Sequence, residues 1–395
     1  MKNSKGFNLV SVIIIICISS IVSGITTGII ATNSYKSSTG LSYNDILNDQ
    51  ELNDFLEVYS SILSNYYEDV NKEEMLDTAV DAMLNYLGDT YTSYLNSDER
   101  EALEERLKGT YEGIGIRILN TTIDSIVADS PAEEAGLQAG DVIVSVNGND
   151  VTDKSGDEIS ILIKNSDNNM VNLVINRNGT ELSFDLKIAS DLISPAINYK
   201  MIDNTIGYLQ IELFSKTLSI QVEKAISDLK NQGMAKLIID LRDNTGGYLE
   251  SAEATANIFL EKGKLIYSLE DKEKTADYYD ESEESTNFPI VILLNSTSAS
   301  ASEILAAALK DSYGAVFVGE KSYGKGKVQQ TYQLSDGSMA KLTSAKWLRP
   351  NGQCIDGIGL IPDYESSLII NTNETGEAEI IDNQLNKAIE VIGTM

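Results

Sequence analysis

The chain has 395 residues, of which 42% are hydrophobic, so it is long enough for two or three domains and too apolar for general disorder. Its 30 basic residues stand against 60 acidic ones, a formal net charge of −30, and a basic face that binds nucleic acid is not expected. The sequence contains no histidine. This excludes a Ser-His pair and the histidine motifs of zinc proteases, and it leaves a lysine made neutral by burial as the base for any acyl transfer.

The N-terminus predicts a membrane anchor. No charged residue occurs between Gly6 and Tyr35, and Lys2 and Lys5 precede this apolar run. About 23 residues, 8–30, are enough to span a bilayer, and the lysines would stay in the cytoplasm. Residues 1–36 are therefore predicted to form a cytoplasmic end and a transmembrane helix, with the rest of the chain exported; a cleaved signal peptide is the alternative.

The two cysteines do not predict a disulfide framework. Cys17 lies inside the apolar run and follows Ile16, which does not suit a lipoprotein cleavage site, and Cys354 is far away in the sequence. No C-x-x-C pair occurs. The fold is therefore not expected to depend on oxidation.

Residues 37–108 are predicted to form a small helical domain after a polar linker. Apolar residues recur at helical spacing in 52–63 and in 72–87, and Gly88-Asp89 breaks the second segment. A third, highly charged helix is expected over 98–107.

Residues 109–190 change to the alternating pattern of strands. Strands are expected to begin at 113–116 and to continue over 123–127, 142–146 and the hairpin 171–186, with short helices at 130–137 and 157–163. Asn147-Gly148 is a hairpin signal. The string from Ser130 to Asp141 followed by V-I-V-S-V-N-G resembles a PDZ domain. The resemblance implies that Gly113, Ile114 and Gly115 bind the terminal carboxylate of a peptide that adds as a strand; a glycine turn without a ligand is the alternative.

Residues 191–395 alternate strands and helices, which predicts α/β layering around a mostly parallel sheet. Strands are expected at 207–211, 237–241, 290–294 and 315–318, and helices at 219–231, 249–260 and 300–310. The acidic, turn-rich segment 268–287 is expected to be an exposed insertion.

Ser300 is the candidate nucleophile, at the start of a helix that follows a strand. Ser300 and Glu303 also match a capping box, so an N-cap without chemistry is the alternative. The two interpretations, nucleophile and N-cap, are compatible, because the free amides at a helix N-terminus can stabilise an oxyanion beside a serine placed there.

Lys325 is the candidate base, and its surroundings also match part of a phosphate-binding loop. Gly319 and Gly324-Lys325 have the right spacing, but Gly326 replaces the required Ser or Thr, and 328–334 has strand character. We therefore reject nucleotide binding. Lys327 is expected either to lower the pKa of Lys325 by repulsion or to point to solvent.

A glycine turn follows the strand that ends near Asp240. The paired glycines Gly246 and Gly247 would let backbone amides approach a bound oxygen, as an oxyanion hole requires.

Together these strings resemble the C-terminal processing peptidases, also called tail-specific serine proteases. The motifs that carry the resemblance are G-D-T-Y-T-S-Y-L, the PDZ string, D-L-R-x-N-x-G-G, S-A-S-A-S-E-I, G-E-K-S-Y-G-K-G-K-V-Q and G-I-G-L-I-P-D. Thr90 and Thr245 depart from the usual pattern. The resemblance implies an α/β ClpP/crotonase-like protease core at 191–395, with Ser300 as nucleophile, Lys325 as general base and Gln329 orienting the lysine. The oxyanion amides would come from Gly246 or Gly247 and from Ala301.

The predicted protein is thus a membrane-anchored extracytoplasmic serine endopeptidase that cleaves proteins near disordered C-terminal tails. No cofactor, metal or nucleic acid is expected, and assembly into a homo-oligomer stays open. The alternative from another class is a membrane-tethered PDZ peptide receptor whose protease domain is inactive.

Overall fold

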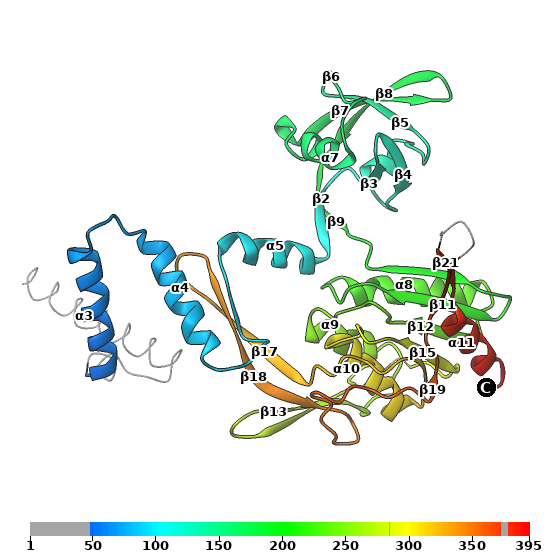
Figure 1. Ribbon diagram of the computed structural model, residues 1–395. Coiled ribbons are helices and arrows are strands. Elements are labelled where there is room, and N and C mark those ends of the chain that lie inside the picture. Colours follow the sequence, from blue (N-terminus) through cyan, green and yellow to red (C-terminus); the bar gives the residue numbers. More distant parts are fainter. Residues whose placement is uncertain (1–47, 284, 373–377) are drawn as a thin grey trace, which may run out of the picture. The chain divides into compact units, whose positions relative to one another are not determined.

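The computed structural model describes residues 48–283, 285–372 and 378–395, and the chain divides into two compact units after Ala82 (Figure 1). The predicted anchor at 8–30 and Cys17 lie outside the described residues. None of the helices in the described part of the chain has the length and apolar character needed to cross a bilayer. Cys354 is a free cysteine.

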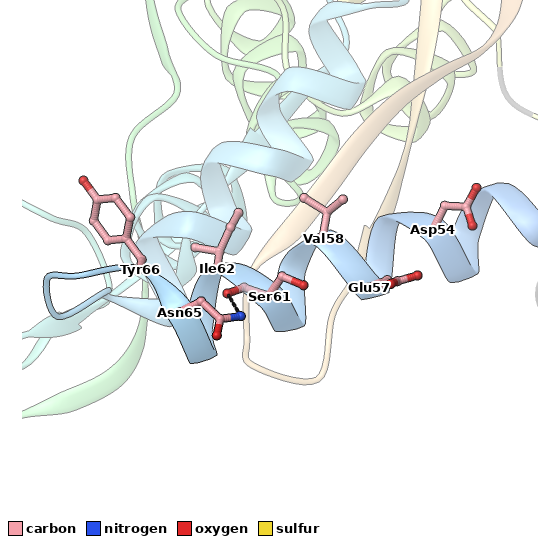
Figure 2. Close-up of a pocket in the computed structure, with 7 residues that line it drawn as sticks. All are labelled: Asp54, Glu57, Val58, Ser61, Ile62, Asn65 and Tyr66. Atoms are coloured by element: carbon pink, nitrogen blue, oxygen red, sulfur yellow. Dashed lines mark hydrogen bonds between the residues drawn. The ribbon is translucent and has the colours of Figure 1, made fainter.

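The first unit holds the helices α3, Gln50–Asn65, and most of α4, Lys72–Asn85. Both cover segments that the sequence predicts as helical. Asp49 caps α3 by accepting a hydrogen bond from the Leu52 amide at 2.9 Å. No side chain of α3 is buried, and one side of this helix carries a shallow hollow of about 550 Å³ (Figure 2).

The second unit begins with the end of α4, the short strand β1, Ser93–Leu95, and the helix α5, Ser97–Lys108. Asn96 and Glu99 form a capping box at the start of α5, and Gly109 ends the helix with a φ of +73°. Between α4 and β1, Gly88 has a φ of +64°, as expected for the predicted break.

Residues 116–187 form the small sheet that the PDZ resemblance predicts, while residues 110–113 pair with residues 189–193 in a separate two-stranded sheet. The order of the PDZ sheet is β3-β4-β5-β7-β8, with β6 on β5, so β3 is an edge strand. The turn at Asn147-Gly148 joins β5 to β6, both residues having positive φ, as the hairpin signal indicates. The elements are β2 (Thr110–Gly113), β3 (Ile116–Leu119), β4 (Thr122–Ile126), α6 (Pro131–Glu134), β5 (Val142–Val146), β6 (Asn149–Asp150), α7 (Gly156–Lys164), a 3-10 turn (Asp167–Asn169), β7 (Met170–Arg177) and β8 (Thr180–Lys187). Strand β2 ends at Gly113 instead of running on to Ile116, because Gly115 turns with a φ of +88°.

The remaining chain builds a six-stranded sheet of order β10-β11-β12-β15-β16-β19. Only β10 is antiparallel to its neighbour, which confirms the predicted mostly parallel sheet. Its members are β10 (Ile197–Met201), β11 (Ile206–Ile211), β12 (Lys236–Asp240), β15 (Ile290–Leu294), β16 (Val316–Gly319) and β19 (Tyr364–Glu365); β9 (Ala189–Ile193) pairs with β2 before the chain enters this sheet.

Both faces of this sheet are buried, which explains its nearly continuous apolar strands. The main hydrophobic core lies between one face and three helices, α8 (Leu218–Asn231), α9 (Leu249–Ala256) and α10 (Ala301–Ala308). A smaller core lies between the other face and α11 (Asn383–Gly393). Helix α9 is shorter than predicted, and a π-helical turn, Leu309–Tyr313, follows α10.

A second sheet has the order β1-β18-β13-β14, with β17 also paired to β18. It contains β13 (Leu265–Glu270), β14 (Thr275–Tyr279), β17 (Lys327–Gln333) and β18 (Met339–Leu348). The prediction that 268–287 is an exposed insertion is confirmed for residues 271–275, which are exposed, but the segment is not an irregular insertion, because its first half belongs to the hairpin of β13 and β14. Tyr278 stacks on Tyr267 at 4.6 Å and the Ser268 side chain is buried, so packing overrides the polar composition of this segment. A last hairpin pairs β20 (Ile369–Thr372) with β21 (Ala378–Ile381).

Candidate active site

Ser300 lies in the connection from β15 to α10, at the end of a tight turn. Its backbone has φ +58° and ψ −118°, a conformation that costs a non-glycine residue about 1–3 kcal/mol. The turn is held by Ser298, whose buried Oγ accepts a hydrogen bond from the Asn295 amide and donates one to the Leu241 carbonyl at 2.8 Å. Strain that the surrounding structure maintains is typical of functional positions.

Glu303 ties this turn to the loop that carries Lys325. The Ser300 amide donates to Oε2 of Glu303 at 2.9 Å, as the predicted capping box requires. The same oxygen accepts the Lys325 amide at 2.9 Å. Glu303 is fully buried, and its other oxygen, Oε1, accepts from Ser322 Oγ and from the Gly324 amide. Burial raises the pKa of Glu303, although these four donors act in the opposite direction. The sequence shows Glu303 as a cap but not as the link between the two candidate catalytic residues.

The backbone of Lys325 is fixed on both sides. Its amide donates to Glu303, and its carbonyl accepts the indole N–H of Trp347 at 2.8 Å. The flanking Gly326 allows a close approach, because a Cβ there would lie 2.6 Å from the Asp356 amide nitrogen. Strand β17, and not a helix, follows this loop, which agrees with the rejection of a nucleotide site.

The surroundings of Lys325 favour its neutral form. Burial lowers the pKa of Lys325 below its ordinary 10.5, and the positive charge of Lys341 lowers it further, while Asp89 and Glu303 oppose both effects. The cation whose charge lowers the pKa of Lys325 is thus Lys341 on β18, and not Lys327, for which the sequence left a pKa effect and a solvent-facing position as alternatives. The charge of Lys327 is instead paired, since its ammonium lies 3.3 Å from the Asp89 carboxylate. Nothing in the sequence pattern signals Lys341, because it reaches the site only through strand pairing.

Gln329 lies on β17 and faces the same cavity as Lys325. Its Nε2 donates to Thr343 Oγ1 at 3.2 Å. In the described part of the chain no hydrogen bond joins Gln329 to Lys325, so its predicted orienting role stays a prediction.

Gly246 and Gly247 lie directly beside the Ser300 turn. A Cβ on Gly246 would lie 3.0 Å from both the Ala301 nitrogen and Ser300 Cβ, so only glycine fits there. The Gly246 amide already donates to Oδ1 of Asn244 at 2.8 Å. Among the described residues, the amides of Gly247 and Ala301 have no acceptor, and these two are the better candidates for an oxyanion hole.

One cavity of about 910 Å³ collects these residues, with Ser300, Lys325, Gln329, Gly246 and Gly247 in its wall. Apolar side chains and five cationic ones line the rest, against a single carboxylate. The apolar group includes Leu213, Leu249, Ile304, Val328 and Trp347; the cations are Arg106, Lys216, Lys325, Lys327 and Lys341, and the carboxylate is Glu250. The chain as a whole has twice as many acidic as basic residues, but cationic residues outnumber acidic ones in the wall of this cavity.

The hollow on α3 is chemically different. Its seven lining residues, Asp54, Glu57, Val58, Ser61, Ile62, Asn65 and Tyr66, include no lysine or cysteine (Figure 2). The Asn65 side chain there donates to the Ser61 carbonyl within the same helix. The hollow thus holds carboxylates but none of the lysine chemistry that the acyl-transfer hypothesis requires beside a serine.

The predicted carboxylate loop lies at the edge of the PDZ sheet, just before β3. Gly115 must be glycine, because a Cβ there would meet the Ser130 side chain at 2.1 Å. The carbonyls of Ile114 and Gly115 accept hydrogen bonds from Ala132 and Val127 inside the domain. The loop's carbonyls are thus occupied, and no strand in the described residues pairs with the outer edge of β3.

Comparison with known proteins agrees with this geometry. The model of Peptidase family S41 matches residues 205–366, that of the PDZ domain matches 122–177, and that of the activating protease CtpB N-terminal domain matches 25–99. The chain is 35% identical to the carboxy-terminal processing protease CtpA of Bacillus subtilis (strain 168), over 90% of this chain and 76% of that protein. The chain belongs to the C-terminal processing proteases of peptidase family S41.

Two further proteins are similar to this chain. A probable CtpA-like serine protease of Staphylococcus aureus (strain MRSA252) is 35% identical over 85% of this chain and 70% of that protein. The photosystem II D1 C-terminal processing protease is a solved structure with 26% identity and a TM-score of 0.49, covering 84% of this chain and 91% of that one. The S41 and PDZ family models, together with the curated CtpA relative, show that this protein is a serine peptidase with a PDZ domain, as the sequence motifs predict.

Proposed function

We propose that this S41 peptidase cleaves peptide bonds with Ser300 as nucleophile and Lys325 as general base. The observation that carries the proposal is the Glu303 carboxylate, which accepts both the Ser300 and the Lys325 amides while both residues face one cavity. The absence of histidine removes the usual competing base. A lysine whose pKa is lowered by burial is the remaining group with the required chemistry.

The reaction follows from these positions. The neutral amine of Lys325 takes the proton of Ser300 Oγ while the oxygen attacks the peptide carbonyl carbon. The amides of Gly247 and Ala301 stabilise the negative charge on the carbonyl oxygen. The resulting ammonium then gives its proton to the leaving amine, and water hydrolyses the acyl-enzyme with Lys325 as base again.

The PDZ domain is proposed to hold the substrate by its C-terminus. The open edge of β3 can accept a peptide as an added strand, and the loop of Gly113, Ile114 and Gly115 can donate amides to the terminal carboxylate. The names of the relatives describe C-terminal processing, and we extend this activity to proteins with disordered tails. The apolar run at 8–30 supports anchoring in the cytoplasmic membrane with the protease outside.

A cleavage assay with matched variants tests the catalytic pair. The full-length protein is incubated with a folded protein that carries a disordered C-terminal tail, and the mass of the product is followed. Ser300→Ala and Lys325→Ala should each abolish cleavage, and the double variant should lose no more than either single one. The controls are Ser296→Ala in the same turn and Lys321→Ala in the same loop, since both side chains are exposed.

Two results would contradict this assignment. Activity of Lys325→Ala equal to that of the wild type would rule out Lys325 as the base. Absence of cleavage by the wild type, with tight binding of the tail, would instead favour the receptor alternative.

A further inference from the structure

Tyr91 contacts the candidate base from a part of the chain that precedes the PDZ domain. The Nζ of Lys325 lies 5.0 Å from the centre of the Tyr91 ring, and the Nζ of Lys327 lies 5.6 Å from the same ring. Both distances are within the range of cation–π attraction. One aromatic face is thus shared by two lysines of the same loop.

The segment that carries Tyr91 is tied firmly to the protease sheet. The Asp89 carboxylate accepts hydrogen bonds from the Tyr91 amide and from Thr92 Oγ1, and it pairs with Lys327. Thr92 Oγ1 in turn accepts the Thr343 amide of β18 at 3.2 Å. Strand β1 continues this attachment by pairing with β18, where Ser93 lies opposite Lys341. The ring therefore has a fixed place beside the base.

The Tyr91 phenol stays neutral over the pH range of peptide hydrolysis. Burial and the neighbouring Tyr323 raise the pKa of Tyr91 to about 12, with smaller contributions from Asp356 and Glu303. A neutral ring presents a partly negative face to an ammonium group but gains little from a neutral amine. Tyr91 thus attracts the protonated form of Lys325, together with Asp89 and Glu303, while burial and Lys341 act against that form.

We propose that Tyr91 is a positioning residue of the active site, whose ring holds the Lys325 side chain at the end of the cavity where it serves as the base. This inference rests on the proposed Ser300–Lys325 function. It adds the 88–95 segment to the active site, although this segment is separated from the protease core by the whole PDZ domain in the sequence. The four-carbon stem of a lysine is flexible, and a ring on one side reduces the positions its amine can take.

The ring's attraction for the ammonium has a measurable sign. Without the ring, Lys325 should lose its proton at a lower pH. In Tyr91→Leu the rise of kcat with pH should therefore occur at a lower pH than in the wild type. An attraction at the usual strength of cation–π pairs corresponds to a shift of about 0.4–0.7 pH unit. The alkaline plateau should fall about tenfold because the amine is less well placed. Tyr91→Phe keeps the ring, so the pH at which kcat rises and the kcat reached at alkaline pH should both equal those of the wild type.

The experiment compares full-length wild type, Tyr91→Phe, Tyr91→Leu and the longer, unbranched Tyr91→Met over a pH series. Tyr279→Leu, an exposed tyrosine on β14, is the matched control. A second readout needs no activity: the rate at which an amine-reactive reagent labels Lys325 at each pH, followed by peptide mass spectrometry, gives the pKa of that amine directly.

Each outcome decides a different point. The proposal is supported if kcat rises at a lower pH in the Leu and Met variants than in the wild type, and if labelling gives a correspondingly lower pKa for Lys325. The proposal is overturned, and Tyr91 is a structural residue, if the pH dependence of kcat and the labelling of Lys325 are unchanged in both variants. It is also overturned if Tyr91→Phe is as impaired as Tyr91→Leu. If Lys325→Ala is fully active, the proposed mechanism fails instead, and the labelling shift still shows whether the ring acts on the amine.

Discussion

Replacing Glu303 by glutamine changes almost no volume and tests the link between the two halves of the active site. In the wild type each carboxylate oxygen accepts two hydrogen bonds: Oε1 from Ser322 Oγ and the Gly324 amide, Oε2 from the Ser300 and Lys325 amides. Glutamine has one oxygen and one NH₂ group. If the NH₂ group faces the Ser300 and Lys325 amides, both of these donors lose their acceptor; if it faces Ser322 and Gly324, only the Gly324 amide does, because the Ser322 hydroxyl can accept a hydrogen bond instead.

The size of the effect depends on how many donors lose their acceptor. Leaving a buried donor unsatisfied costs about 1–3 kcal/mol, so one or two give about 1–6 kcal/mol. Burial raises the pKa of Glu303, which means that neutralising the side chain also relieves part of the desolvation cost. We therefore expect the lower end, about 1–3 kcal/mol, a large share of the 5–15 kcal/mol typical of folded proteins. Where the NH₂ group faces the Ser300 and Lys325 amides, loss of these anchors should lower kcat by about 100-fold, as misplacement of catalytic groups does.

Chemical denaturation at pH 7 and the tail-cleavage assay measure the two effects separately. Glu261→Gln is the control, because it removes one exposed carboxylate from the same acidic protein. The reasoning is refuted if Glu303→Gln unfolds at the same denaturant concentration as Glu261→Gln and keeps its kcat. A loss of stability without a loss of kcat would show that the carboxylate supports the fold but not the placement of the pair.

Three further predictions follow from the site. Gly246→Ala adds a Cβ 3.0 Å from the Ala301 nitrogen at a φ of +104°, and kcat should fall at least 100-fold while the PDZ still binds peptide; unchanged kcat would remove this turn from the active site. Amidating the C-terminus of a tail peptide removes the charge that the loop at Gly113–Gly115 would hold, so binding measured by calorimetry should weaken about 10–100-fold, and equal affinities would contradict the carboxylate site. Peptides with glutamate beside the cleaved bond should have a higher kcat/KM than glutamine versions, because cations dominate the cavity, and this ratio should fall as salt rises; a ratio of one at low salt would contradict it.

Local sequence signals predicted most elements of the fold. The strands of the main sheet are buried on both faces, so their apolar runs are clear, and β11, β12, β15 and β16 lie within a residue or two of the predicted ranges. The PDZ region follows its turn signals in the same way, at Asn147-Gly148 above all. The hairpin of β13 and β14 was missed because it is polar, and its stability depends on packing against β18 far along the chain.

The same division holds for the candidate site. Ser300, Lys325 and the paired glycines carry motifs, and the structure places them around one cavity. Lys341 lies in no motif, and the G-D-T-Y-T-S-Y-L motif that contains Tyr91 does not indicate a place beside the base. Both residues come near Lys325 through pairing with β18, which no local pattern specifies. The sequence offered Lys327, two residues along the chain, as one possible neighbouring charge, but the ammonium of Lys327 pairs with Asp89.

A final prediction concerns stability: because the pKa of Lys325 is lowered in the folded protein, its protonated form should lower the free energy of unfolding. The pKa of Lys325 is lowered in the folded state, while in the unfolded chain it has its ordinary value of 10.5. Between these two values the unfolded state binds more protons, so the free energy of unfolding rises with pH across that window. The cost is complete below the folded pKa and disappears above 10.5.

Lys325→Met keeps a similar length without a charge and should therefore unfold at a higher temperature than the wild type at pH 7, although it should be inactive. The difference in melting temperature should narrow as the pH approaches 10.5, and exposed Lys321→Met should show no such trend. If the wild type is instead the more stable protein at pH 7, the attraction of Tyr91, Asp89 and Glu303 for the ammonium exceeds the cost of burial. Lys325 would then be held charged in the resting enzyme, and a bound substrate would have to displace water or charge before the lysine could act as a base.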